Sequence, residues 1–379
     1  MPTPTRIIDT REGLQQQWPD LRGTAVVGVD LRGLDLDLSL AQVHGAMFLG
    51  CRFSPGLAGE LTARGAAALS NLGSVPFEIY RAQLYSYAEL AAGYEAGLED
   101  TLDAVITRWF DSSSSASLPD LVVRALHDAT IDAAVARFVL GHRVVGVMGG
   151  HALARDAPLY RRVALLGRAL SRAGFTVATG GGPGVMEAAN FGAWSAPHDD
   201  DVLDRALEVL ARSPDHPSDP EGYVGRAMEV RATWPDGGVS LGVPTWVYAQ
   251  EPTGLFASHI AKYFTNSVRE DGLLAIARSG VVYAPGGAGT EQEIFTDLAQ
   301  NSLTLYGVRS PMVFFDSDHY EVDHPDLLSA ARRQATRFGW GELITVCDDP
   351  VATVAFISDH DPDGAGVSGV DERRTHKDV

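Results

Sequence analysis

The sequence of 379 residues has few cysteines and no long apolar run. Cys51 and Cys347 lie far apart, and neither stands in a CxxC spacing or beside a histidine cluster. This excludes a disulfide framework and gives no zinc signature, so no metal site is predicted. No uninterrupted apolar run approaches the ~20 residues that span a bilayer, and the N-terminal segment lacks the apolar core of a signal peptide. The expected location is therefore the cytoplasm.

Positive charge is also scarce. The chain has 30 Lys and Arg against 49 Asp and Glu, a formal net charge of −19, and no dense basic run. Such a field repels polyanions unless a local basic patch overcomes it. Neither nucleic acid nor a membrane is expected as a partner. A small anionic ligand is compatible with this charge, because backbone N–H dipoles at a helix N-terminus bind anions without net positive charge.

The composition, 45% hydrophobic and 21% charged, predicts a globular protein with a large core and two domains. Apolar pulses that begin with TAVVGV at 24–29 predict short stacked strands, and residues 80–98 predict a helix. The polar run DSSSSAS at 111–117 predicts a linker. The predicted division is a small N-terminal accessory domain at 1–110, a linker and leading helix at 111–140, a main domain at 141–360 and a frayed tail at 361–379.

From Arg143 onward, strand-like and helix-like patterns alternate. Residues 144–148 and 175–178 have the composition of buried strands, and residues 159–173 between them have helical spacing. Further strands are predicted at 239–243, 245–248, 281–283, 312–315 and 343–346, and further helices at 118–140, 258–277 and 327–338. This alternation predicts an α/β fold, with a Rossmann-like doubly wound parallel sheet beside the smaller domain. The acidic stretch at 195–236 is predicted to be a solvated insertion, with a lid over the site as the alternative.

Two glycine-rich loops each follow a predicted strand and precede a predicted helix. They are APGGAG, within residues 281–295, and GGGPG at 180–184. Glycines let backbone N–H groups close on a ligand, and a helix N-terminus favours an anion, so a phosphate fits this arrangement. Either loop alone is equally compatible with an ordinary βα turn. Because both lie at strand carboxyl ends, one crevice between them is the predicted binding site.

The pair of loops, GGGPGVMEAAN and PGGAGTEQE, resembles the LOG (Lonely Guy) family, which includes the larger bacterial nucleotide 5′-monophosphate nucleosidases. The fixed positions of the family motif PGGxGTxxE are matched at Pro285, Gly286, Gly287, Gly289, Thr290 and Glu293. The resemblance spans about residues 140–350 and leaves the N-terminal unit outside. It implies a homodimer or higher homo-oligomer that hydrolyses the N-glycosidic bond of a nucleoside 5′-monophosphate to free base and ribose 5-phosphate. It implies no metal or other cofactor.

By this resemblance, the motif glycines and Thr290 hold the 5′-phosphate, and Glu293 is the catalytic carboxylate that faces the ribose. A carboxylate suits this place, because departure of the base leaves oxocarbenium character on the sugar, which a negative charge stabilises while water attacks. The alternative role for Glu293 is a charge that complements the helix dipole, for which Glu291 is the better candidate.

The family's Arg-Lys pair, in the helix before this loop, is missing from the expected positions, which are Glu270 and Asp271. Arg269 lies one residue earlier, a shift of about 100° around a helix and about 1.5 Å along it. It is kept as the second catalytic candidate, because a change in the turn at Ser279 and Gly280 would restore the register.

The remaining residues predicted to bind the nucleotide are Gly150, His151, Gly181, Gly182, Gly184, Met186 and Asn266. His151 is also typical of a turn and Met186 of a core, while His259 and Asn266 are expected on one helix face. The rival hypothesis is a non-catalytic protein of the same fold that binds a nucleotide or a phosphorylated cofactor such as the molybdenum cofactor. The intact GTxxE favours the hydrolase, and the missing Arg-Lys pair favours the binding protein.

Overall fold

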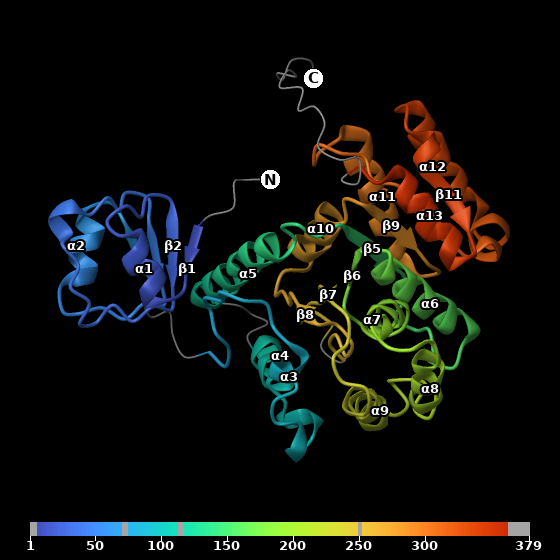
Figure 1. Cartoon of the computed structure of the whole chain (residues 1–379), viewed down its shortest axis with the longest axis horizontal. Coiled ribbons are helices and arrows are strands. Elements are labelled where there is room, and N and C mark those ends of the chain that lie inside the picture. The colour runs from blue at the N-terminus through green and yellow to red at the C-terminus, as the bar shows by residue number, and fades with distance from the viewer. Residues whose placement is uncertain (1–5, 70–74, 113–116, 249–251, 363–379) are drawn as a thin grey trace.

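The computed structural model describes residues 6–69, 75–112, 117–248 and 252–362. The protein is an α/β protein with two parallel sheets, one of four strands and one of seven (Figure 1). Figure 1 places the small sheet at one end of the molecule, with helix α5 between it and the large sheet. The predicted fold class is confirmed.

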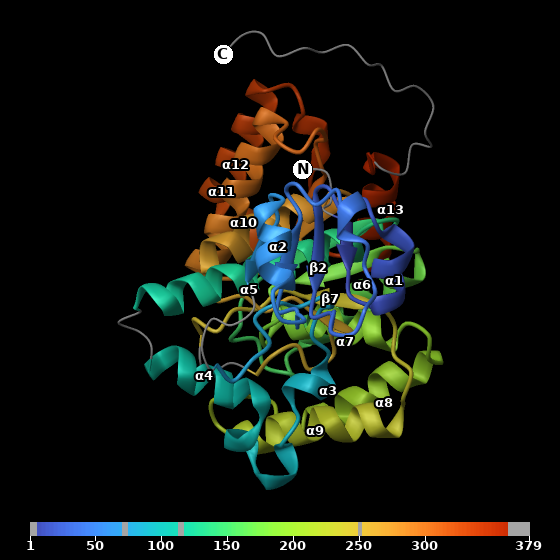
Figure 2. The same ribbon diagram turned by 90° about the vertical axis from the view of Figure 1, so that its left-hand side faces the viewer.

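The small sheet is built from the short apolar pulses of the first seventy residues. Its strands are β1 (Arg6–Ile8), β2 (Thr24–Val27), β3 (Met47–Leu49) and β4 (Ala67–Leu69), paired in sequence order. The helices α1 (Arg11–Gln17) and α2 (Leu57–Ala63) join them and bury Leu14 and Leu61 against its core. Figure 2 turns this sheet toward the viewer.

The next segment, residues 75–112, packs on the large sheet. The predicted helix at 80–98 is wrong: the chain forms a short helix α3 (Tyr87–Leu90) and the 3₁₀ turns η2 (Tyr94–Ala96) and η3 (Leu98–Asp100), then α4 (Leu102–Ser112). Gly93 and Gly97 interrupt the helix with φ values of 101° and 140°, which disfavour other residue types. The domain boundary at 110 stays a prediction, and the core of the large sheet already contains Tyr85, Tyr87 and Ile106.

Helix α5 (Leu118–Phe138) lies between the two sheets and contacts both. Leu126 packs beside Val27 and Leu49 of the small sheet. On another side, the Asp128 carboxylate accepts hydrogen bonds from the backbone N–H groups of Phe264 and Thr265, at 2.9 Å each. This helix therefore couples the two sheets.

The large sheet has the strand order β11-β10-β9-β5-β6-β7-β8, all parallel. Its strands are β5 (Val144–Met148), β6 (Thr176–Thr179), β7 (Ser240–Gly242), β8 (His259–Ile260), β9 (Gly280–Tyr283), β10 (Met312–Phe315) and β11 (Ile344–Cys347). The chain leaves β5 toward β6 and returns to its other side as β9, so the order reverses at β5. A crevice at such a switch point is where open α/β sheets bind ligands.

Helices cover both faces of this sheet (Figure 1). They are α6 (Pro158–Arg172), α7 (Val185–Ser195), α8 (Asp200–Leu210), α9 (Pro220–Thr233), α10 (Asn266–Ile276), α11 (Ala288–Leu303), α12 (Pro325–Arg337) and α13 (Pro350–His360). Helices α8 and α9 lie in the stretch predicted to be a solvated insertion. That prediction is wrong, because Leu203, Leu207 and Leu210 of α8 and Val230 of α9 enter the main core. Within the described residues, no helix is long and apolar enough to cross a membrane.

Two predicted elements around residue 260 are also wrong. The helix expected at 258–277 begins only at Asn266, and the preceding residues form β8 at the sheet edge. The strand expected at 245–248 is reduced to one bridge between Thr245 and Tyr263. An aromatic cluster fixes this region, with Trp246 stacked on Phe264 at 4.4 Å between ring centroids and Phe77 at 4.9 Å from Phe264. These long-range contacts override the local helical pattern. The predicted tail lies almost entirely outside the described residues.

Candidate functional site

A cavity of about 360 Å³ lies where the two glycine loops meet at the carboxyl ends of β5, β6 and β9. The residues that line it are Met148, Gly149, Gly150, His151, Gly180, Gly181, Gly182, Met186, Pro244, Thr245, Tyr248, Pro252, Thr253, Arg269, Glu270, Gly287, Ala288, Gly289, Thr290 and Glu293. We call it the inner cavity. Its volume lies at the lower end of the range of small-molecule sites, roughly 300–1,000 Å³.

The second loop, residues 285–290, is held by its neighbours on one side and open on the other. The Gly150 N–H donates to the Pro285 carbonyl oxygen at 2.9 Å. A Cβ at Gly286 would overlap the Thr290 side chain and lie 2.9 Å from the Gly150 nitrogen, so only glycine fits there. By contrast, a Cβ at Gly287 or Gly289 would meet nothing within 4 Å. These two glycines keep the entrance to the α11 N-terminus clear.

The N-terminus of α11 forms one wall of the inner cavity. Gly287 precedes the helix and has no side chain to cap it. The first N–H groups of a helix have no intrahelical partner, and they carry the positive end of the helix dipole. The wall therefore presents backbone donors suited to an anion such as a phosphate.

The first loop, residues 180–184, is packed more tightly than the second. Gly181 and Gly184 have φ values of 74° and 70°. A Cβ at Gly181 would lie 2.7 Å from the Pro244 ring, and one at Gly184 would overlap the Gly150 carbonyl oxygen. The Thr179 hydroxyl accepts hydrogen bonds from the Gly181 N–H and the Asn190 amide. This loop serves as a rigid floor for the second one.

Arg269 reaches the inner cavity despite its early position on α10. Its Nε donates to the Val243 carbonyl oxygen at 2.7 Å, and its Nη2 contacts the Gly180 carbonyl oxygen at 3.4 Å. One guanidinium nitrogen, Nη1, lies 3.7 Å from the Glu293 carboxylate and 3.9 Å from that of Glu270. The structure thus brings both predicted catalytic candidates to one place.

Glu293 lies one turn into α11 and is nearly buried, with 13% of its side chain exposed. Burial raises the pKa of its carboxyl to about 7, with the nearby Arg269 charge lowering it and Glu270 raising it further. Among the described residues, none donates a hydrogen bond to this carboxylate. Near neutral pH it can hold or release a proton, as a general acid or base must.

Most of the predicted binding residues line the inner cavity, but three do not. Gly184 and Gly286 pack behind it, as described above. Asn266 donates instead to the Glu270 carboxylate at 2.8 Å and lies 3.4 Å from the Tyr248 hydroxyl. The predicted sharing of a helix face by His259 and Asn266 is wrong, because His259 lies in β8, with its ring against Phe138.

Sequence reasoning missed several lining residues, chiefly Pro244, Thr245, Tyr248 and Thr253. Pro244 and Thr245 follow β7 after one intervening residue, so the rule that crevices form at strand carboxyl ends could have found them. Thr253 carries no such local signal. It is placed by Lys262, whose ammonium group contacts its hydroxyl at 2.5 Å.

Residues 142–197 match the model of the SLOG cluster4 family. The match runs from β5 to the end of α7 and so includes the first glycine loop but not the second. It supports an SLOG-type domain there, the coarser form of the resemblance seen in the sequence. No curated protein matches the chain.

Solved structures that are similar to this chain include the molybdenum cofactor binding protein from Rippkaea orientalis, at 15% identity over 57% of this chain and 96% of that one, with a TM-score of 0.34. The molybdenum cofactor carrier protein from Chlamydomonas reinhardtii is similar at 18% identity over 57% and 97%, with a TM-score of 0.36. A second structure of the Chlamydomonas reinhardtii carrier is 19% identical over 57% of this chain and 96% of that one, with a TM-score of 0.35. Likeness at this level says nothing about a ligand.

Proposed function

We propose that the inner cavity binds a nucleoside 5′-monophosphate or a related phosphorylated small molecule. The observation that carries the proposal is the second loop, which keeps open space in front of Gly287 and Gly289 at the N-terminus of α11. A phosphate on these backbone N–H groups needs no basic side chain. The net charge of −19 therefore does not oppose it.

The size and walls of the inner cavity fit the rest of such a ligand. The Met186 and Tyr248 side chains and the Pro244 ring supply apolar surface, and Arg269 and Glu293 supply polar groups. Small-molecule sites combine apolar walls with a few polar groups in this way. Binding without cleavage accounts for all of these features.

The test is calorimetry with a panel of nucleoside 5′-monophosphates, ribose 5-phosphate and inorganic phosphate. Gly289→Val places a branched side chain in the open space and is expected to weaken the best-bound monophosphate at least about tenfold, roughly 1.4 kcal/mol. The matched nucleoside without phosphate serves as the ligand control, and unfolding by heat confirms that the variant is folded. Equal affinity for nucleoside and monophosphate would contradict the proposal.

Hydrolysis of the N-glycosidic bond is a second candidate, and the position of Glu293 favours it. When ionised, its carboxylate can accept a proton from an attacking water and stabilise positive charge that develops on the ribose. Arg269, 3.7 Å away, holds the ionised form and can stabilise a leaving base that gains negative charge. The products are the free base and ribose 5-phosphate.

Incubation with the same monophosphates separates the two functions. Release of both products supports hydrolysis, and Glu293→Gln is then expected to lower turnover at least about 100-fold, because general acid–base catalysis contributes ~10²–10⁴. Glu291→Gln, in the same helix turn but on the exposed side, is the matched control. Tight binding without product, or full turnover by Glu293→Gln, would exclude the hydrolytic role proposed for Glu293.

A further inference from the structure

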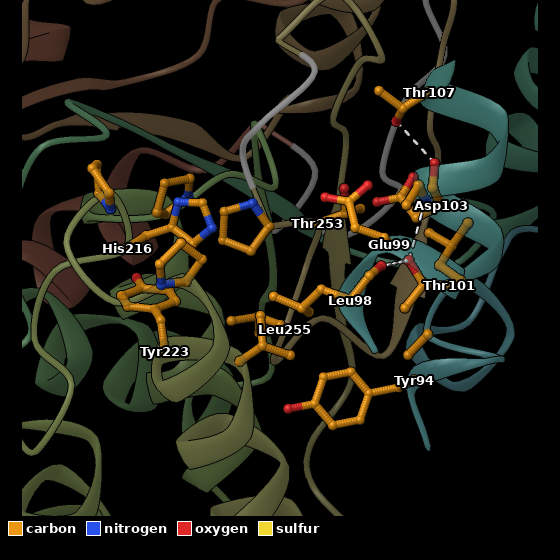
Figure 3. Close-up of a pocket in the computed structure, with 18 of the residues that line it drawn as sticks. Tyr94, Leu98, Glu99, Thr101, Asp103, Thr107, His216, Tyr223, Thr253 and Leu255 are labelled. Carbon is orange, nitrogen blue, oxygen red and sulfur yellow. Dashed lines mark hydrogen bonds between the residues drawn. The ribbon is translucent and has the colours of Figure 1, made fainter. Parts of the chain in front are cut away.

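A second, larger cavity of about 760 Å³ adjoins the inner one. Two segments outside the strand-loop-helix core build its walls. One is the N-terminal arm, residues 87–111, and the other is the stretch at 214–224, which enters α9. Figure 3 shows Tyr94, Glu99 and Asp103 from the arm on one side and His216 and Tyr223 on the other, with Thr253 and Leu255 between them. We call this space the outer chamber.

The outer chamber and the inner cavity lie side by side and share three lining residues. His151, Pro252 and Thr253 line both. Pro183, in the middle of the first glycine loop, lines the outer chamber but not the inner cavity. The outer chamber, about twice the volume of the inner cavity, therefore lies directly beside the space that would hold the rest of a ligand whose phosphate lies on the second loop.

Buried ion pairs and hydrogen bonds fix both walls of the outer chamber to the main domain. Buried Arg155 donates through Nε and Nη2 to Glu187 at 2.7 and 3.0 Å, and through Nη1 to the Tyr223 carbonyl oxygen at 2.8 Å. This fixes the 214–224 segment to α7. On the opposite side, Lys262 pairs with Asp103 at 2.7 Å and contacts Thr253, which fixes the arm to the floor of the site.

Charge in the outer chamber is negative. Its lining holds four carboxylates, Glu99, Asp103, Asp111 and Asp215, and one guanidinium, Arg108. Arg108 contacts Glu99 at 3.2 Å, and Lys262 neutralises Asp103. Asp111 and Asp215 have no basic partner among the described residues. Burial lowers the pKa of His216, so its imidazole is neutral at pH 7 and adds no positive charge.

Aromatic and aliphatic surface completes the lining. Tyr94 and Tyr223 contribute rings, the His216 ring lies edge-on to Tyr223 at 5.4 Å, and Leu98 and Leu255 contribute aliphatic side chains. The Tyr223 ring face is already covered by the Arg155 guanidinium at 3.3 Å, so Tyr94 is the ring of the two that is left for a ligand. An anionic group placed here would meet like charges, whereas an ammonium group or an uncharged ring would meet carboxylates and the Tyr94 ring.

We infer that the outer chamber receives the end of the ligand farthest from its phosphate and selects a cationic or uncharged group over an anionic one. This inference rests on the proposed function of the inner cavity. It assigns to the N-terminal arm and the 214–224 segment the role of determining specificity. The ligand class is a nucleoside monophosphate that carries an extended, amine-bearing or uncharged substituent.

The test measures the affinity of four probes at about 0.15 M salt, where long-range attraction to the acidic chain is screened. The first is AMP, which has no substituent on its base. The second is N6-(6-aminohexyl)-AMP, whose substituent ends in a cation. The other two are its N-acetyl derivative, which ends in an uncharged group, and its N-succinyl derivative, which ends in an anion. The aminohexyl probe is expected to bind at least about tenfold more tightly than the succinyl probe, a difference of ~1.4 kcal/mol. Equal affinity, or tighter binding of the succinyl probe, would overturn the inference.

Variants separate the outer chamber from the overall charge. Asp111→Asn with Asp215→Asn is expected to reduce the preference for the amine below threefold. Glu321→Gln with Asp323→Asn changes the net charge equally, at exposed positions outside the cavity lining, and is expected to retain the preference. A preference that survives the first pair contradicts the inference.

The two proposals fail differently. If AMP binds and Gly289→Val weakens it, but the terminal charge has no effect, only the role of the outer chamber is wrong. If Gly289→Val leaves AMP affinity unchanged, the inner cavity does not hold the phosphate and both proposals are wrong. Absence of binding by all four probes and by every monophosphate of the calorimetry panel likewise contradicts both.

Discussion

Two helices follow glycine loops in this protein, and each buries a glutamate beside an arginine. In α7, Glu187 accepts two hydrogen bonds from Arg155 and a third from the Tyr160 hydroxyl at 2.6 Å. In α11, Glu293 faces Arg269 at 3.7 Å inside a cavity. The Glu187 carboxylate is satisfied by hydrogen bonds within the protein, whereas the Glu293 carboxylate faces a cavity that can hold a ligand. Similar sequence patterns thus give a structural pair in one loop and a pair available for chemistry in the other.

Removal of the Glu187 carboxylate tests this comparison with the largest expected effect. Glu187→Ala leaves Arg155, whose side chain is fully buried, without its partner and is expected to cost about 3–5 kcal/mol of unfolding free energy. Urea unfolding measures this change. Glu293→Ala is the matched substitution and is expected to lower the unfolding free energy by less than about 1 kcal/mol. The reason is that burial already destabilises the charged form of the carboxylate that it removes. Equal losses for the two variants would erase the distinction.

The pH dependence of stability sharpens the comparison. Because the Glu293 pKa rises from 4.5 to about 7 on folding, the native state binds more protons than the unfolded state between these values. This contribution to stability is fully present below about pH 4.5 and is lost as the pH rises through 7. It amounts to about 3 kcal/mol at most. Glu293→Gln is expected to flatten the profile of unfolding free energy over this range, and a profile identical to that of the unmodified chain would contradict the raised pKa.

The glycines of the two loops give the smallest expected effect. Gly184→Ala introduces a Cβ at a φ of 70° that overlaps the Gly150 carbonyl oxygen, and it is expected to cost about 1–3 kcal/mol. Gly287 has a φ of −100°, and a Cβ there would meet nothing within 4 Å. Gly287→Ala is therefore expected to change the unfolding free energy by less than about 0.5 kcal/mol. Thermal unfolding of both variants is the measurement. A larger loss for Gly287→Ala would reverse the roles assigned to the loops.

Local sequence patterns predicted the framework well. Strand β10 occupies the predicted residues 312–315, and α5 begins at the predicted Leu118, because apolar runs and helical spacing decide such elements locally. The convergence of both loops on one crevice followed from strand direction alone. The direction of the Arg269 side chain did not follow, since it depends on where α10 begins, and the aromatic cluster around Phe264 determines that.

The walls of the outer chamber could not be predicted for a similar reason. The 195–236 stretch is acidic and irregular in composition. Its helix α8 nevertheless carries Leu203, Leu207 and Leu210 at spacings of four and three residues, which places all three on one face, and they enter the core. Its place beside the N-terminal arm depends on Arg155 and Glu187, which are 32 residues apart in the chain. No local pattern carries that information.

The backbone bridge between Tyr85 and Ile260 has a consequence for how the chain can be divided. Strand β8 is the last strand of the large sheet, and Tyr85 exchanges two hydrogen bonds with Ile260 across its outer edge, at 2.8 and 2.9 Å. Unpaired strand edges template the association of further chains. A fragment that began at residue 111 would expose this edge and uncover Trp246 and Phe264. The segment at 75–110 therefore protects the fold from aggregation and cannot be exchanged as an independent module.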